Sequence, residues 1–124
     1  MTIAYWCVLA AAVLPYVSVA FAKYRPDYDN ARPREWLARL DGFRARAVWA
    51  HHNAFEAFPP FAAGVIIAHL AGAPQGRIDA LALAFIAARI AYTACYLLDR
   101  PTPRSIVWTV GFACVIGLFV AAAL

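Results

Sequence analysis

The chain has 124 residues, a length that suits one domain, and 65% of them are hydrophobic. Soluble domains are roughly 45–50% apolar, so this composition excludes an ordinary soluble protein and indicates an integral membrane protein. The formal net charge of +4 does not indicate a nucleic-acid partner, because the basic residues gather in one connection between apolar segments. The three cysteines are scattered and form no CxxC pair, so neither a disulfide framework nor a zinc cluster is expected.

Four apolar segments are long enough to cross a bilayer, which needs roughly 20 residues in a helix. We predict an all-α integral membrane protein, a four-transmembrane-helix bundle that forms one domain over residues 1–124. The predicted spans cover residues 3–24, 43–72, 77–98 and 104–123. Residues 20–22 resemble a signal-peptidase site, but no basic residue precedes the first apolar run, which favours an uncleaved span.

The loop between the first two spans, residues 23–45, and the helical turn after it are strongly basic. Their basic residues are Lys23, Arg25, Arg32, Arg34, Arg39, Arg44 and Arg46. By the positive-inside rule this loop is cytoplasmic, which places both termini outside. Within it, Trp36, Leu37 and Leu40 would share one side of a helix over residues 33–40, which predicts a short amphipathic helix at the membrane interface.

Polar residues form one stripe along the second predicted span, at offsets that a helix of 3.6 residues per turn brings to one face. The members of this stripe are Arg46, Trp49, Asn53 and Glu56. Lipid offers no partner for an amide or a carboxylate, so such groups inside a span are functional-site candidates. His51, His52 and Glu56 lack a third and fourth ligand nearby, so we expect no metal site.

Arg89, Tyr92 and Tyr96 form a second stripe, on the third predicted span. An unpaired arginine at mid-membrane costs at least ~2.5 kcal/mol, so Arg89 needs an anion. Glu56 is the best carboxylate within the spans, and we predict a Glu56–Arg89 contact between the second and third spans. The pair could serve only to fix helix register. Alternatively, the surplus of cationic and amide groups could bind a small anionic ligand.

Three motifs occur in order along the chain. Residues 46–61 read Arg-x-x-x-x-His-x-Asn-x-x-Glu-x-x-Pro-x-Phe, residues 88–96 read Ala-Arg-x-x-Tyr-x-x-x-Tyr, and residues 103–105 read Pro-Arg-Ser. This pattern resembles the membrane-associated proteins in eicosanoid and glutathione metabolism, the MAPEG family, and its small bacterial members in particular. The resemblance implies a homotrimer that binds glutathione as a co-substrate between subunits, near the cytosolic face.

The resemblance also assigns roles to residues at matched positions. Glutathione would be bound by Lys23, Arg46, Asn53, Glu56, Arg89, Tyr92 and Tyr96. Arg104 would stabilise the glutathione thiolate, and Ser105 would lie beside it as a second catalytic residue. The chain departs from the family where many members carry an arginine four residues before the asparagine, because Trp49 stands there.

The function implied is that of a membrane-bound glutathione transferase or peroxidase, which acts on lipophilic electrophiles or lipid hydroperoxides at the membrane interface. An alternative is a non-catalytic module of the same fold that binds lipids and assists a partner enzyme. The high content of Ala and Arg favours a bacterial cytoplasmic membrane, with the active site facing the cytoplasm. Ser105 has no His–Asp partners in the sequence pattern, which argues against a serine hydrolase.

Overall fold

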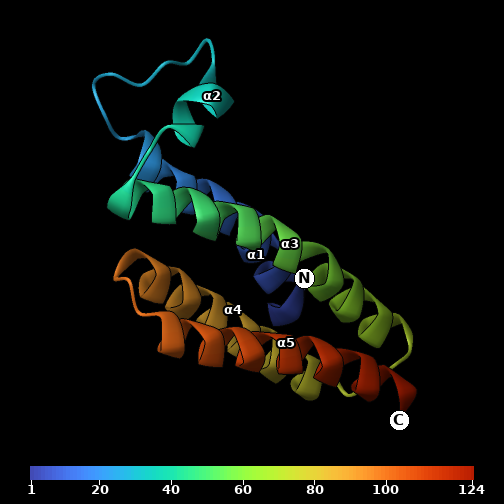
Figure 1. Cartoon of the computed structure of the whole chain (residues 1–124). Helices are drawn as coiled ribbons and strands as arrows, with labels where there is room; N and C mark the ends of the chain where they lie inside the picture. Colours follow the sequence, from blue (N-terminus) through green and yellow to red (C-terminus); the bar gives the residue numbers. More distant parts are fainter.

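The computed structural model describes residues 1–124, all of whose regular structure is helical. Figure 1 shows two pairs of long helices, α1 beside α3 and α4 beside α5, with the short α2 at one end. The helices are α1 (Ile3–Lys23), α2 (Pro33–Ala38), α3 (Gly42–Leu70), α4 (Gln75–Leu97) and α5 (Pro101–Ala123). The all-α prediction is confirmed.

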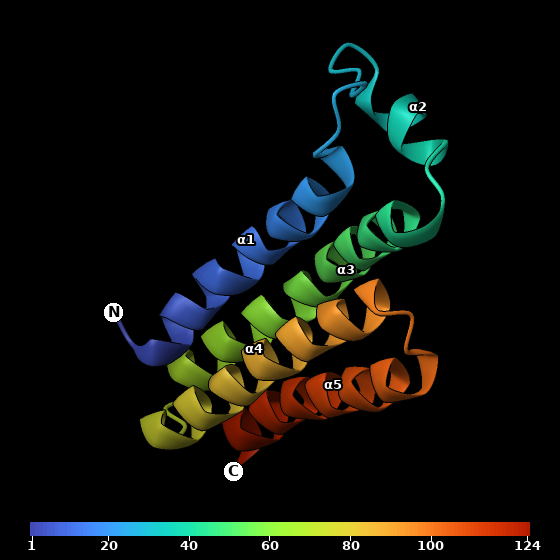
Figure 2. The same ribbon diagram turned by 90° about the vertical axis from the view of Figure 1, so that its left-hand side faces the viewer.

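Short connections set the direction of the last three helices. Four residues join α3 to α4 and three join α4 to α5, so each helix runs back along its predecessor. Figure 2 shows both termini at the end of the bundle opposite α2. The basic loop and the α4–α5 connection therefore lie at one end, and the termini lie at the other.

Three helices, α1, α4 and α5, are long and apolar enough to cross a membrane. The remaining predicted span, residues 43–72, corresponds to α3. Its 29 residues extend about 43 Å at 1.5 Å per residue, but its first half is polar. The difference arises because Arg44, Arg46 and Glu56 lower the hydropathy of α3. Whether α3 crosses the membrane thus depends on which way these side chains face.

The main hydrophobic core lies at the end of the bundle near the termini. It combines the first half of α1, the second half of α3, the first half of α4 and the second half of α5. Phe61 of α3 stacks on Phe85 of α4 at its centre, with ring centroids 3.9 Å apart. At the other end only Ala22, Ala47 and Val48 form a buried cluster, against which Leu37 and Leu40 pack. The bundle is thus closed near the termini and less tightly packed toward α2, where the polar stripes lie.

A close approach of α3 to α5 depends on Gly64. A Cβ added there would lie 3.2 Å from the Leu118 Cβ, tighter than most real contacts. We expect Gly64→Val to destabilise the fold by about 1–3 kcal/mol through overpacking. Thermal unfolding in detergent should show a lower midpoint. The matched control is Gly76→Val on α4, where an added Cβ meets nothing within 4 Å. Equal shifts in both variants would contradict this account of the α3–α5 contact.

Candidate functional site

Arg89 is the charged centre of the site. It is only 4% exposed, and its guanidinium Nη2 donates to Asn53 Oδ1 at 2.7 Å. Asn53 Nδ2 in turn donates to Glu56 Oε2 at 3.2 Å. The two stripes on α3 and α4 therefore meet, as predicted, and the amide of Asn53 lies between a cation and an anion.

The predicted direct Glu56–Arg89 contact is wrong. The three ion pairs of the structure all lie within residues 25–39, and none joins these two side chains. The half-buried amide of Asn53, one turn before Glu56, takes the guanidinium donor, which leaves Glu56 exposed. The Asn53 amide can join both groups because its oxygen accepts from the cation and its nitrogen donates to the anion.

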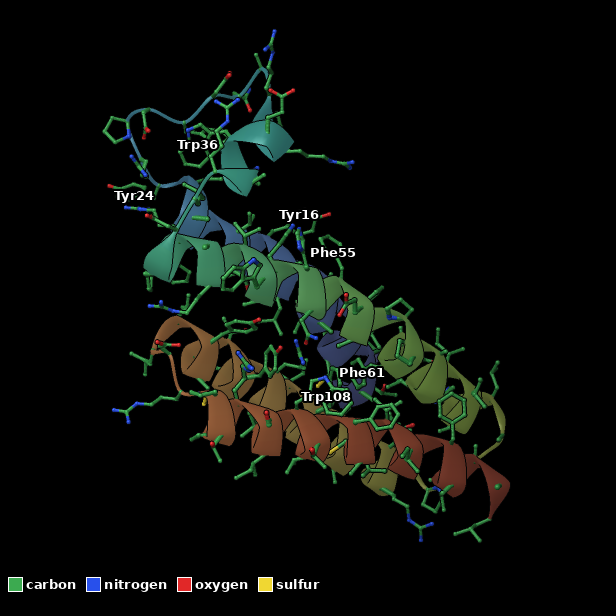
Figure 3. The ribbon with its side chains drawn as sticks, viewed as in Figure 1. Tyr16, Tyr24, Trp36, Phe55, Phe61 and Trp108 are labelled. Atoms are coloured by element: carbon green, nitrogen blue, oxygen red, sulfur yellow. The ribbon has the colours of Figure 1, made fainter.

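A hollow of about 160 Å³ opens beside these groups, between α3, α4 and α5. Asn53, Glu56 and Arg89 form its polar side, while Trp108 and Phe112 belong to its apolar side. Figure 3 shows Phe61 and Trp108 in the space between α3 and α5. A cavity of roughly 150 Å³ can hold one benzene ring, so this hollow has room for a small apolar group.

A second hollow of about 240 Å³ adjoins the first and shares Asn53 and Trp108 with it. Its other lining residues are Tyr92, Arg104, Ser105 and Thr109. One site thus has a more polar chamber and a more apolar one, which meet at an amide and an indole.

Cation–aromatic contacts hold the two arginines in place. The Arg89 guanidinium carbon lies 4.3 Å from the centre of the Tyr92 ring, and that of Arg104 lies 4.4 Å from the centre of the Tyr96 ring. The two tyrosine rings are themselves 5.6 Å apart. Both guanidiniums are therefore oriented by neighbouring rings of α4.

Trp49 joins this cluster from α3, with its ring 6.3 Å from that of Tyr96. Its side chain supplies an apolar face where many family members are expected to carry an arginine. Trp49 remains 52% exposed and lines neither hollow. Tryptophan in place of arginine at position 49 therefore changes the rim of the site, while the residues that line the two hollows are unaffected.

Ser105 borders the polar hollow, as its assignment requires, but its hydroxyl is already engaged. It donates to the Pro101 carbonyl at 3.1 Å, one turn earlier in α5. The hydroxyl oxygen can still accept a hydrogen bond. Ser105 is thus placed to accept a hydrogen bond from a bound group, and no base lies at hand to make it a nucleophile.

Arg46 is placed differently from the other assigned residues. Its Nη2 donates to the Leu97 carbonyl at 3.3 Å, which satisfies one of the free carbonyls at the end of α4. Its Nε is buried and has no partner. After Leu97 the chain turns through Asp99, whose φ of 55° lies in the left-handed region. In this structure Arg46 fixes the end of α4 that carries Tyr96, and it lines neither hollow.

In the single chain, Lys23 lies away from the other residues that were assigned to glutathione binding. Its Nζ is 5.3 Å from the centre of the Tyr28 ring, and it borders a different hollow with Tyr24 and Arg25. Any contact of Lys23 with the site would therefore have to come from a neighbouring subunit.

The sequence patterns missed the contribution of α5 to the apolar hollow. Trp108, Phe112 and Val115 line it, and the Trp108 and Phe112 rings stack at 5.4 Å. The available signal was the spacing of Trp108, Phe112 and Val115, which share one helix face at four- and three-residue intervals. An aromatic residue in an apolar span is equally consistent with a contact to lipid. The sequence pattern alone therefore did not identify Trp108 and Phe112 as residues of the site.

Comparisons with known proteins identify the family of the chain. No curated protein and no solved structure gave a significant match to the chain. The model of the MAPEG family, in contrast, matches residues 3–124, which is essentially the whole chain. This match and the three apolar helices together identify the chain as an integral membrane protein. The chain therefore belongs to the MAPEG family.

Proposed function

We propose that this protein is a membrane-bound glutathione transferase that activates the glutathione thiol for attack on lipophilic electrophiles or lipid hydroperoxides. Membership of the MAPEG family supports a glutathione transferase-like or related function. The observation that carries the finer proposal is the pair of adjoining hollows, one bordered by Arg104 and the other by Trp108 and Phe112. A reaction between a charged thiol peptide and an apolar electrophile needs both kinds of chamber side by side.

The polar groups match the chemistry of glutathione, which carries two carboxylates, two amides, an amine and a thiol. Arg89 and Arg104 offer guanidinium donors for carboxylates or a thiolate. The Glu56 carboxylate can accept from the amine, and it borders the same hollow as Arg89. Pro60 has no N–H, so the Glu56 carbonyl has lost its regular helical donor and is a further acceptor there.

Arg104 is the residue that we propose activates the thiol. A nearby cation favours the thiolate over the thiol, and the thiolate is the nucleophile. The thiol proton passes to solvent, the sulfur forms a bond to the electrophilic carbon, and the leaving group departs with its electron pair. With a lipid hydroperoxide, two glutathione molecules would be oxidised to the disulfide while the hydroperoxide is reduced to an alcohol and water.

The membrane arrangement follows from the same placement. Asn53 and Glu56 of α3 line the hollow beside Arg89 of α4, so we propose that α3 also crosses the membrane, with these groups turned away from lipid. The site lies toward the basic loop, which we propose is cytoplasmic in a bacterial membrane, with both termini outside. We further propose a homotrimer, in which Lys23 from a neighbouring subunit could reach the site.

The test is a titration of the purified protein with glutathione, followed by turnover of an aromatic chloro-electrophile. We expect saturable binding, as measured by calorimetry in detergent, and thioether formation that requires the folded protein. Glu56→Gln should weaken binding, since a neutral amide is a poorer partner for an amine. A folded protein that neither binds glutathione nor forms thioether would overturn the proposal.

A non-catalytic lipid-binding module, which assists a partner enzyme, is the second candidate. Trp49 favours it, because an aromatic ring stands at the rim of the site instead of an arginine. Binding of glutathione or lipid without turnover, across electrophiles of different size and reactivity, would select this module over the transferase.

A further inference from the structure

A third hollow lies on the seam between α1 and α3, near the end of the bundle that carries α2. Its volume is about 410 Å³, and it shares no residue with the two hollows of the glutathione site. Its lining residues are Val17, Ala20, Phe21, Tyr24, Phe43 and Arg44. Three residues of α1 and Tyr24, which follows its last residue, are spaced as one face of a helix. The Phe21 and Phe43 rings meet edge to face at 6.3 Å. The hollow is therefore an apolar groove with one cation in its wall.

Arg44 is fixed at this groove by the backbone of α1. Its Nη1 donates to the Phe21 carbonyl at 2.8 Å, one of the last carbonyls of the helix and so without a helical donor. A guanidinium has five N–H donors, and this is the one hydrogen bond that Arg44 makes. None of the three ion pairs of the structure includes Arg44. The groove thus contains an oriented arginine with free donors and no anionic partner.

A second cation lies next to the groove. Tyr24 borders both the groove and a neighbouring hollow, which Lys23 and Arg25 also border. Arg25 is neutralised by Asp27 at 2.9 Å, whereas Lys23 has no carboxylate partner. Figure 3 shows Tyr24 close to the loop that carries α2, away from Trp108. Two unneutralised cations therefore flank a tyrosine at the point where an apolar membrane helix ends.

We propose that this groove binds an anionic glycerophospholipid, with an acyl chain against Val17, Ala20 and Phe43 and the phosphate against Arg44. The apolar wall fits an acyl chain, which a free phosphate ion does not have. The oriented guanidinium fits a headgroup with net negative charge, which a zwitterionic lipid lacks. Anionic lipids attract basic juxtamembrane residues at the cytoplasmic surface, where we place this end of the bundle. The inference rests on the proposed membrane orientation but not on the glutathione site.

Native mass spectrometry of the purified protein in detergent tests this, with phosphatidylglycerol and phosphatidylcholine of the same acyl chains added in turn. We expect one phosphatidylglycerol retained per chain, and about tenfold weaker retention in Arg44→Gln, since a charge-assisted hydrogen bond is lost. The matched control is Arg34→Gln, which removes the same charge from exposed α2 and should leave retention unchanged. Inorganic phosphate should not displace the lipid. Lys23 is left intact because of its proposed role with glutathione.

A second variant tests the acyl groove without changing charge. Ala20→Trp places a large side chain in the groove from an exposed position on α1, so the fold should tolerate it. We expect it to reduce phosphatidylglycerol retention as Arg44→Gln does, while thermal unfolding and thioether formation stay near wild type. The proposal fails if phosphatidylcholine is retained equally well, if Arg34→Gln and Arg44→Gln behave alike, or if Ala20→Trp retains lipid normally. If Arg44→Gln does not fold, Ala20→Trp decides the question by itself.

Discussion

Arg104→Ala should reduce thioether formation by at least about 100-fold, because the cation that we propose stabilises the thiolate is lost. Arg104 borders the polar hollow from the first turn of α5, where the Tyr96 ring orients its guanidinium at 4.4 Å. Glutathione binding should fall far less than turnover, since Arg89, Asn53 and Glu56 remain. Steady-state kinetics with glutathione varied, combined with a calorimetric titration, would separate the two effects.

The pH dependence gives a second readout for the same variant. An ordinary cysteine thiol has a pKa of about 8.5, and a neighbouring cation lowers the pKa of a bound thiol. The wild-type rate should therefore level off at a lower pH, while the Arg104→Ala rate should continue to rise toward about pH 8.5. The difference between the two proteins should thus be largest at low pH and shrink as the pH rises.

The matched control is Arg100→Ala, about one turn earlier, at the residue that precedes α5. Arg100 is exposed and borders neither hollow, so its removal changes the net charge without touching the site. Its rate and pH profile should match the wild type. A similar loss in both variants would mean that general positive charge near the membrane, and not Arg104, drives the reaction.

Much of the fold could be predicted from hydropathy alone. Four long helices begin and end within three residues of the predicted segments, because long apolar runs in a membrane protein have few alternatives to a helix. Three of these helices are long and apolar enough to cross a membrane. The ends of the helices depend on turn chemistry that hydropathy does not report. Asp99, for example, takes a left-handed conformation just after α4, which an apolar average cannot reveal.

The candidate site was predicted in outline but not in its contacts. Helical spacing brought Asn53, Glu56 and Arg89 to facing stripes, and the structure joins these stripes through one hydrogen-bonded chain. Charge alone favoured a direct Glu56–Arg89 pair, whereas the Arg89 guanidinium of α4 lies at the height of the Asn53 amide on α3. Which residue of α3 the Arg89 side chain contacts depends on how far the two helices are shifted along their axes. Spacing within each helix does not determine this shift. The proposed role of Lys23 needs a neighbouring subunit, and contacts between subunits cannot be read from the sequence of one chain.

Arg89→Ala should weaken glutathione binding by about 100-fold, because a buried cation that can meet a carboxylate or the peptide is lost. Arg89 is 4% exposed and borders the apolar hollow together with Glu56. The fold should tolerate the change, since burying a guanidinium that has no ion-pair partner is costly, and relief of this cost offsets the lost contacts with Asn53 and Tyr92. Isothermal titration with glutathione and thermal unfolding of the same sample would separate binding from stability. Arg77→Ala, an exposed arginine near the start of α4 and away from both hollows, is the control and should bind normally.

A double-mutant cycle distinguishes a ligand contact from a purely structural one. Asn53 Oδ1 accepts from Arg89 at 2.7 Å, so the effects of Asn53→Ala and Arg89→Ala on binding should be strongly non-additive. If the pair serves the ligand, the coupling appears in the binding free energy and is small in the free energy of unfolding. If the pair only fixes the register of α3 against α4, the coupling appears in unfolding, and glutathione binds the folded variants as it binds the wild type. The second outcome would remove Arg89 from the binding site while leaving the fold as described.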